Sequence, residues 1–128
     1  MVIQGILDTS IVIDLLRGVG PALEWFNPAR HDQMAITPVV WMEVAQGAVD
    51  KASLDRAMRF MRRFHLEHPT PDDNIWAMRQ FARVRLSHKI DYPDALIASV
   101  AARLDVPLYT LNLRHYTLLL GDRAQRPY

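Results

Sequence analysis

The chain has 128 residues, of which half are hydrophobic and 23% are charged. This composition is typical of an ordinary globular protein, so we expect one domain over residues 1–128. The absence of cysteine excludes disulfide-rich folds, zinc ribbons and thiol nucleophiles, and it fits the reducing cytoplasm. Asp8 and Asp14 interrupt the apolar N-terminus, and the apolar run Ala95–Ala102 is too short to cross a bilayer. We therefore expect neither a signal peptide nor a membrane protein.

The net charge of +1 is unevenly distributed along the chain. The segment from Arg56 to Lys89 carries a net charge of +5, and the remainder carries −4. Two interpretations stay open. The segment could bind an anionic partner, or it could form two amphipathic helices with solvated arginine faces.

The first half of the chain alternates between strand and helix patterns. In chain order, the predicted elements are a strand over 2–7, helices over 11–17 and 21–26, a strand over 33–36, a helix from 38 to between 45 and 49, and a helix over 53–64. Asp8, Thr9 and Ser10 can cap the first helix, and Thr37-Pro38 is a typical helix start.

The second half continues the alternation with longer helices. The predicted elements are a short strand over 66–68, helices over 72–87 and 93–104, a strand over 107–110, and one short helix within 113–120. The tail, residues 121–128, is polar, and we expect it to be loose. Strands that alternate with helices predict an α/β fold with a mainly parallel sheet.

Polar side chains follow the predicted strands, where ligands of parallel sheets bind. Asp8 directly follows the first strand, Glu43 lies two turns into the helix after the second, and Asp94 lies in the first turn of the apolar helix. The last strand ends in Thr110-Leu111-Asn112. Each acid also has a simpler explanation, since Asp8 could cap a helix, Asp94 could interact with a helix dipole and Glu43 could be solvated.

The surroundings of two acids argue against the simpler explanations. Glu43 is the only charged residue between Val39 and Ala45, and Asp94 precedes a run in which Ser99 is the only polar residue. Half-buried acids need a proton, a base or a metal as a partner. Two carboxylates about 5 Å apart repel by roughly 3 kcal/mol at an effective dielectric near 20. Few basic residues lie near the strand ends, so we expect a divalent cation, and oxygen ligands select Mg²⁺ or Mn²⁺.

Four segments resemble, in order and spacing, the motif blocks of PIN-domain ribonucleases, and in particular of VapC-like toxins from toxin–antitoxin pairs. The segments are Ile6-Leu7-Asp8-Thr9-Ser10, Trp41-Met42-Glu43-Val44-Ala45-Gln46-Gly47, Pro93-Asp94-Ala95-Leu96-Ile97-Ala98-Ser99 and Leu108-Tyr109-Thr110-Leu111-Asn112. The resemblance covers the chain from end to end. It implies a three-layer PIN-like fold whose mainly parallel sheet has four to five strands flanked by helices.

The resemblance also implies a function and a set of residue roles. It implies a Mg²⁺- or Mn²⁺-dependent endoribonuclease that forms a homodimer and is blocked by an antitoxin protein. By position, Asp8, Glu43 and Asp94 match the metal-binding acids of the family. Glu43 would be a further ligand or would accept the proton of the attacking water. In the family, further polar residues hold the acids or the bound water in position. The matching residues here are Thr9 or Ser10, Thr110 and Asn112.

The chain departs from the family at one position. Many members have the pattern Asn-x-x-Asp-Phe, whereas this chain has His115 followed by Tyr116. The substitution puts a four-carboxylate site and a fully occupied second metal in doubt. His115 could be a surface loop residue, or it could shift the metal preference toward Mn²⁺. Arg114, or arginines of the basic segment, could hold the RNA backbone.

Two other functions stay open at this point. A receiver-type signalling domain also has an α/β fold and an acidic Mg²⁺ site, but it needs an acid pair and a lysine after a late strand. Residues 110–114 contain no lysine. A non-catalytic PIN-like module that binds RNA or protein is the second alternative, and only His115 favours it.

Overall fold

The computed structural model describes residues 2–26 and 28–128. Its centre is a five-stranded sheet with the order β3-β2-β1-β4-β5, and every neighbouring pair of strands is parallel. The strands are β1 (Gly5–Leu7), β2 (Met34–Ile36), β3 (His65–Leu66), β4 (Leu108–Tyr109) and β5 (Ala124–Gln125). The predicted α/β fold with a parallel sheet is confirmed.

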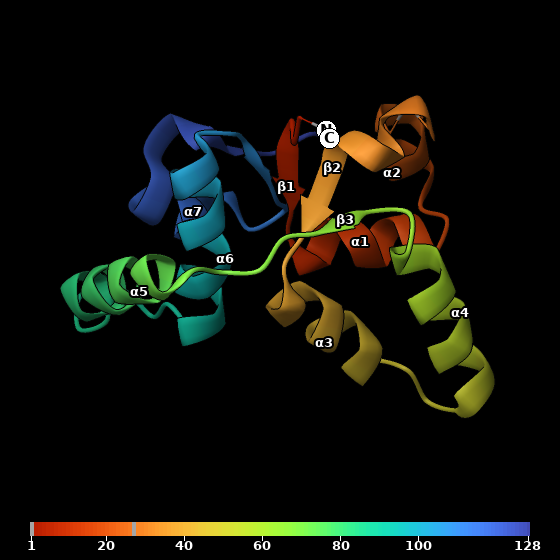
Figure 1. Ribbon diagram of the computed structural model, residues 1–128, viewed down its shortest axis with the longest axis horizontal. Helices are drawn as coiled ribbons and strands as arrows, with labels where there is room; N and C mark the ends of the chain where they lie inside the picture. Colours follow the sequence, from red (N-terminus) through yellow and green to blue (C-terminus); the bar gives the residue numbers. More distant parts are fainter. Residues whose placement is uncertain (1, 27) are drawn as a thin grey trace.

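Helices flank the sheet in two groups (Figure 1). The first group is α1 (Thr9–Leu16), α2 (Gly20–Trp25), α3 (Pro38–Gln46) and α4 (Lys51–Met61). The second group is α5 (Pro71–Val84), α6 (Tyr92–Leu104) and α7 (Leu113–Leu120). Two 3₁₀ helices, η1 (Pro28–Gln33) and η2 (Gly121–Arg123), precede β2 and β5. Contacts between α3 and α6 join the two groups.

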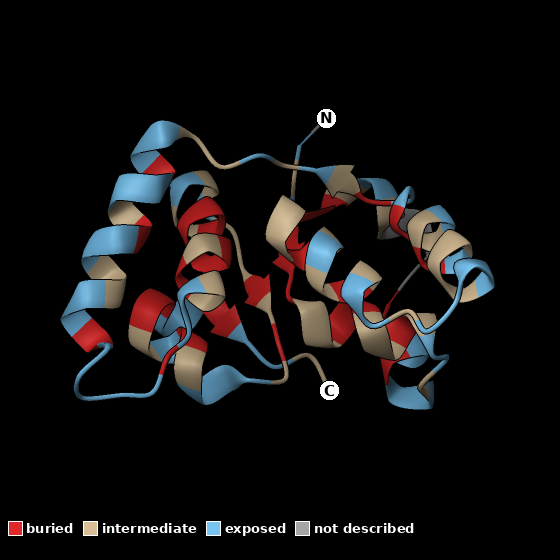
Figure 2. Cartoon of the chain, turned by 90° about the horizontal axis from the view of Figure 1, so that it is seen from below, coloured by how far each residue is buried: buried red, intermediate tan, exposed pale blue. Residues whose placement is uncertain are grey.

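The core lies between the sheet and the inner faces of the helices, as the buried residues in Figure 2 show. All residues of β1 and β2 are buried, which explains their uninterrupted apolar sequences. Helix α6 has six buried residues, including Ile97 and Val100. Its apolar sequence therefore reflects its position in the centre of the molecule.

The strand order places a topological switch point at β1. From β1 the chain continues outward through β2 to β3, and it then crosses to the other side of β1 to form β4 and β5. Loops that leave two neighbouring strands in opposite directions open a crevice at the carboxyl ends of those strands. Asp8 follows β1 and Thr110 follows β4, so both lie at this crevice.

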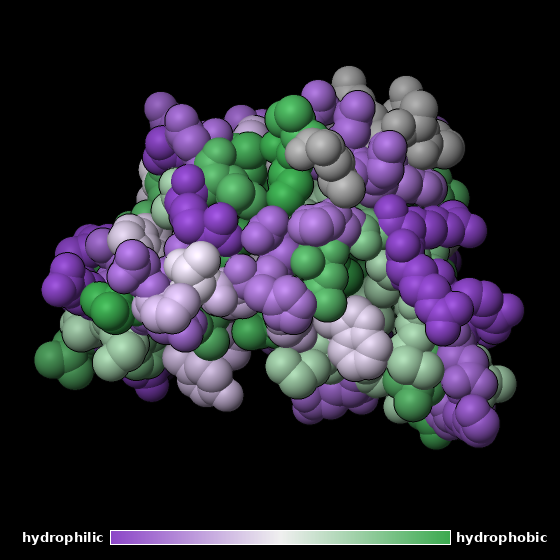
Figure 3. All heavy atoms as spheres, viewed as in Figure 1, coloured by the Kyte–Doolittle hydropathy of each residue, from purple (hydrophilic) through white to green (hydrophobic). Residues whose placement is uncertain are grey.

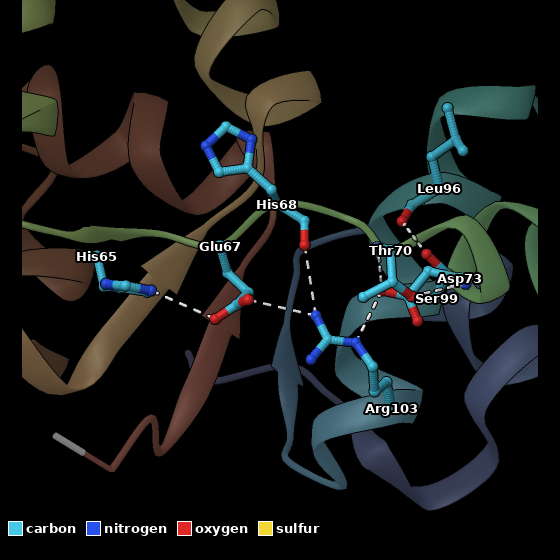
Figure 4. Close-up of polar contacts among 8 residues, drawn as sticks. All are labelled: His65, Glu67, His68, Thr70, Asp73, Leu96, Ser99 and Arg103. Carbon is cyan, nitrogen blue, oxygen red and sulfur yellow. Dashed lines mark hydrogen bonds and ion pairs between the residues drawn. The ribbon is translucent and has the colours of Figure 1, made fainter.

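An ion-pair cluster ties α5 and α6 to the segment that follows the edge strand β3 (Figure 4). Arg103 of α6 donates from Nε to Oδ2 of Asp73, at 2.8 Å, and its Nη2 lies 3.3 Å from Oε2 of Glu67. The Asp73 carboxylate also accepts the backbone N–H of Thr70 and so closes the capping box that begins α5. This cluster fixes α5 against α6.

The C-terminal tail corrects one prediction. We expected residues 121–128 to be loose, but Ala124–Gln125 forms β5 and pairs with β4. Tyr128 packs against Trp25 and donates its hydroxyl to Asp14, at 2.9 Å. The sequence alone is a poor guide to a two-residue edge strand, because pairing with β4 and burial of Ala124 decide its conformation.

The basic segment does not form one surface. Helices α4 and α5 lie at opposite ends of the molecule (Figure 1), and their arginines, such as Arg56 and Arg79, are exposed. Figure 3 shows hydrophilic side chains gathered over the position of α4. The result favours two solvated amphipathic helices over one continuous anion-binding patch. Within the described ranges, no helix has the length and hydropathy needed to span a bilayer.

Candidate active site

Asp8 lies at the end of β1 and directly precedes α1. It occupies the N-cap position of α1, but its side chain makes no capping hydrogen bond. The residue is only 7% exposed. Its Oδ2 accepts hydrogen bonds from Thr110 Oγ1 at 2.7 Å and from Ser10 Oγ at 3.3 Å. The structure therefore does not support helix capping as the role of the Asp8 carboxylate.

The loop after β4 orients the two hydroxyls that hold Asp8. The backbone N–H of Asn112 donates to Thr110 Oγ1 at 2.9 Å, and that of Leu111 donates to Ser10 Oγ at 3.1 Å. Each hydroxyl thus accepts from the backbone and donates to the same carboxylate oxygen. Because these contacts join β1, α1 and β4, Asp8 has little freedom to move.

Asp94 lies opposite Asp8, in the first turn of α6. Its Oδ1 is 3.3 Å from the hydroxyl of Tyr116, and the same hydroxyl is 3.0 Å from Oδ1 of Asp8. Its Oδ2 lies 3.6 Å from Nδ1 of His115. Burial, and next the charge of Asp8, raise the pKa of Asp94 to about 6. The nearby His115 and the Tyr116 hydrogen bond oppose this rise only in part.

Glu43 lies beside this pair on α3, where it is half-buried. Its Oε1 accepts a hydrogen bond from Thr9 Oγ1 at 2.7 Å. Its charge contributes to the raised pKa of Asp94, although less than burial and Asp8 do. An open hollow lined by Thr9, Glu43, Gln46 and Gly47 gives solvent access to this side of the site.

The start of α7 brings His115 and Asn112 to the same site. Asn112 Nδ2 lies 2.8 Å from His115 Nδ1, so His115 lies between Asn112 and Asp94. Its neighbour Arg114 is exposed. The structure therefore places His115 against the acids, and not in a distant surface loop.

Tyr116 is the site residue that sequence reasoning missed. Its side chain is fully buried, and its hydroxyl contacts both Asp8 and Asp94. Burial, followed by the charges of these two acids, raises the pKa of its phenol well above the usual value, so the group stays protonated. The only signal in the sequence is the tyrosine at a position where the family pattern has phenylalanine.

The donor set fits Mg²⁺ or Mn²⁺ in its chemistry. Asp8 and Asp94 offer carboxylate oxygens that share one hydroxyl donor, and no lysine or arginine pairs with them among the described residues. In the same ranges, no three His, Asp or Glu side chains are grouped around one position for a cation. Asp8 and Asp94 are thus brought together directly, whereas Glu43 lies beside them and is bound to Thr9.

Comparisons with known proteins identify the family. The sequence pattern of the PIN domain matches residues 5–118. This chain belongs to the PIN-domain family. The ribonuclease VapC10 of Mycobacterium tuberculosis is 31% identical to it over 114 residues, which cover 88% of this chain and 86% of the relative. The predicted resemblance to PIN-domain ribonucleases of the VapC type is confirmed, and the receiver-type alternative is wrong.

Solved structures share the PIN-domain fold over nearly the whole chain. A toxin–antitoxin complex from Klebsiella pneumoniae has a chain that is 27% identical, with a TM-score of 0.75 and coverage of 98% of both chains. A DNA-bound VapBC structure from Salmonella typhimurium has a TM-score of 0.77 at 22% identity, and the alignment covers 93% of this chain and 94% of that chain. The second likeness supports the fold alone.

Proposed function

We propose that this PIN-domain protein is a Mg²⁺- or Mn²⁺-dependent endoribonuclease, the toxin of a toxin–antitoxin pair. One observation carries the proposal. The buried carboxylate of Asp8 and the half-buried carboxylate of Asp94 converge at the switch point of the sheet, where they share the Tyr116 hydroxyl. Acids arranged in this way raise the free energy of the metal-free protein, and a cation would compensate their charge. The likeness to the ribonuclease VapC10 supports RNA as the substrate.

Each residue has a role that follows from its contacts. Asp8 and Asp94 would hold the ion, while Thr110 and Ser10 keep the Asp8 carboxylate in place. A bound Mg²⁺ or Mn²⁺ would lower the pKa of a water and stabilise charge on the phosphate. Glu43, on the solvent-accessible side, would accept the proton of the attacking water.

Two residues at the start of α7 complete the proposed site. Asn112, together with Thr110, orients the loop around the acids through its hydrogen bonds. Arg114 is exposed next to His115 and would bind an RNA phosphate. Replacement of Arg114 should therefore weaken RNA binding and leave the chemistry at the acids intact.

The partners follow from the same comparison. The toxin–antitoxin complex from Klebsiella pneumoniae supports an antitoxin as the inhibitor of this chain. We further propose that the protein forms a homodimer in the cytoplasm. Co-expression with a neighbouring small open reading frame should relieve growth inhibition and yield a stable complex, and light scattering of the free protein should give the mass of a dimer.

The catalytic proposal is tested by RNA cleavage with purified protein. Wild-type protein should cleave RNA in the presence of Mg²⁺ or Mn²⁺, and cleavage should stop when EDTA is added. Asp8→Asn and Asp94→Asn should each lower the cleavage rate by on the order of 1,000-fold, because each removes an anionic ligand. Asp14→Asn is the matched control, since Asp14 lies on α1 but contacts Tyr128 and not the site.

The outcomes separate a nuclease from a binding module. Circular dichroism should show that all three variants are folded. Cleavage that persists in EDTA, or in Asp8→Asn, would overturn the metal-dependent mechanism. RNA binding without cleavage by wild-type protein under any metal condition would instead identify a non-catalytic PIN-like module.

A further inference from the structure

The two carboxylates of the site face each other across one phenol hydroxyl. Tyr116 extends from α7 into the core, and its hydroxyl reaches Oδ1 of Asp8 at 3.0 Å and Oδ1 of Asp94 at 3.3 Å. Among the described residues, every other hydrogen bond or ion pair of these two carboxylates is made by the second oxygen, Oδ2. The partners are Thr110 and Ser10 for Asp8, and His115 for Asp94.

The facing oxygens therefore share a single proton donor. A phenol has one O–H, so it can donate to only one carboxylate at a time. A hydrogen bond to a carboxylate is stronger than one between neutral groups, and it matters most where water is excluded. Asp8 and Tyr116 are both buried, and the Tyr116 hydroxyl is the donor that lies between the two facing oxygens.

We propose that the Tyr116 hydroxyl takes the place of the cation that Asp8 and Asp94 would hold, and so stabilises the metal-free protein while weakening metal binding. This inference rests on the metal site of the proposed function. Tyr116 is in this view a positioning residue that acts through the two acids. It gives the protein a stable form that does not depend on metal.

The direction of the effect follows from how the acids are held. Asp8 is fixed by Thr110 and Ser10 independently of Tyr116, so loss of the hydroxyl does not release this carboxylate. Loss of the hydroxyl instead leaves two facing anionic oxygens without a donor. A cation held by the two acids would compensate much of their charge, so the hydrogen bond from the hydroxyl would then contribute less to stability. The hydroxyl must then stabilise the metal-free state more than the metal-bound state.

The test compares wild-type protein with Tyr116→Phe, which removes one oxygen atom and keeps the buried ring. Mn²⁺ binding is followed by the loss of the EPR signal of free Mn²⁺, at about pH 8, above the pKa of about 6 of Asp94. We expect Tyr116→Phe to bind Mn²⁺ on the order of 10-fold more tightly. In EDTA it should unfold at a lower urea concentration than wild type. Equal or weaker Mn²⁺ binding by Tyr116→Phe would overturn the inference.

A matched control loses the same kind of hydrogen bond elsewhere. Tyr128 donates its hydroxyl to Asp14 at 2.9 Å, away from the site. Tyr128→Phe should lower stability in EDTA without a change in Mn²⁺ affinity. A change in affinity as large as that of Tyr116→Phe would show a general effect of stability and contradict the proposed role.

A double-mutant cycle keeps the inference testable if Tyr116→Phe does not fold without metal. Asp94→Asn removes one of the two facing charges, so the loss of stability caused by Tyr116→Phe should be smaller in that background. An equal loss in both backgrounds would overturn the inference. Wild-type protein that binds no Mn²⁺, or binds it equally well after Asp8→Asn, would instead contradict the proposed metal site itself.

Discussion

The molecule contains two groups of buried or half-buried acids that are compensated in opposite ways. Beside the edge strand β3, Asp73 of α5 and Glu67 are paired with the guanidinium of Arg103 (Figure 4). At the switch point, Asp8 and Asp94 have hydroxyl donors and His115, but no lysine or arginine among the described residues. Both groups join segments that are far apart in the sequence.

The pKa shifts show what the difference means. Hydrogen bonding to Asp73 raises the pKa of Arg103, so the folded protein favours the charged form of the arginine. Burial and the charge of Asp8 raise the pKa of Asp94, so the folded protein disfavours the charged form of this acid. The pairs of Arg103 stabilise the fold. The charges of Asp8 and Asp94 instead destabilise it, and a bound ligand of opposite charge can compensate them.

The largest expected effect on stability comes from removing Arg103, the basic residue that pairs with Asp73 and Glu67. Arg103→Ala leaves Asp73 buried without its partner and should lower the free energy of unfolding by about 2–3 kcal/mol, given the partial exposure of Arg103. The control is Arg123→Ala, which breaks the exposed pair with Asp105 and should cost about 0.5 kcal/mol or less. Urea unfolding in EDTA measures both. Similar losses in the two variants would contradict a structural role for the Arg103 cluster.

A smaller effect of opposite sign is expected from Asp94. Because the folded protein holds the Asp94 proton more tightly than the unfolded chain does, this group makes stability fall as pH rises from about 4 to about 6. Asp94→Asn should remove this part of the pH dependence and raise the stability of the metal-free protein at pH 7 by about 1–3 kcal/mol. Urea unfolding with EDTA across this pH range measures the effect. If Asp94→Asn is less stable than wild type at pH 7, Asp94 carries no unfavourable charge.

The smallest expected effect concerns the choice of metal. His115 lies 3.6 Å from Asp94, at the position where many PIN domains have an acid. His115→Asp should lower the ratio of Mn²⁺-supported to Mg²⁺-supported cleavage by roughly 3-fold or more, since imidazole suits Mn²⁺ better than Mg²⁺. His88→Asp, at an exposed histidine, is the control. An unchanged ratio in His115→Asp would exclude a role of the imidazole in metal preference.

The sequence predicted the candidate-site residues at the ends of strands and helices better than those that tertiary packing brings to the site. Asp8, Asp94 and Thr110 could be found because each follows or begins an element with a clear hydrophobic pattern, and parallel strands bring their carboxyl ends together. Tyr116 could not be found, because the angle at which α7 enters the core depends on tertiary packing. The pairing of Arg103 with Asp73 was missed for the same reason, since the two residues lie on different helices.

Both outermost strands of the sheet have only two residues, His65–Leu66 in β3 and Ala124–Gln125 in β5. So short a row of backbone donors and acceptors offers little to an incoming extended peptide, and it also protects against edge-to-edge aggregation. A chain that docks on this molecule therefore gains little from strand addition at either edge of the sheet. Recognition then depends on side chains, which can diverge between related proteins while the sheet stays the same.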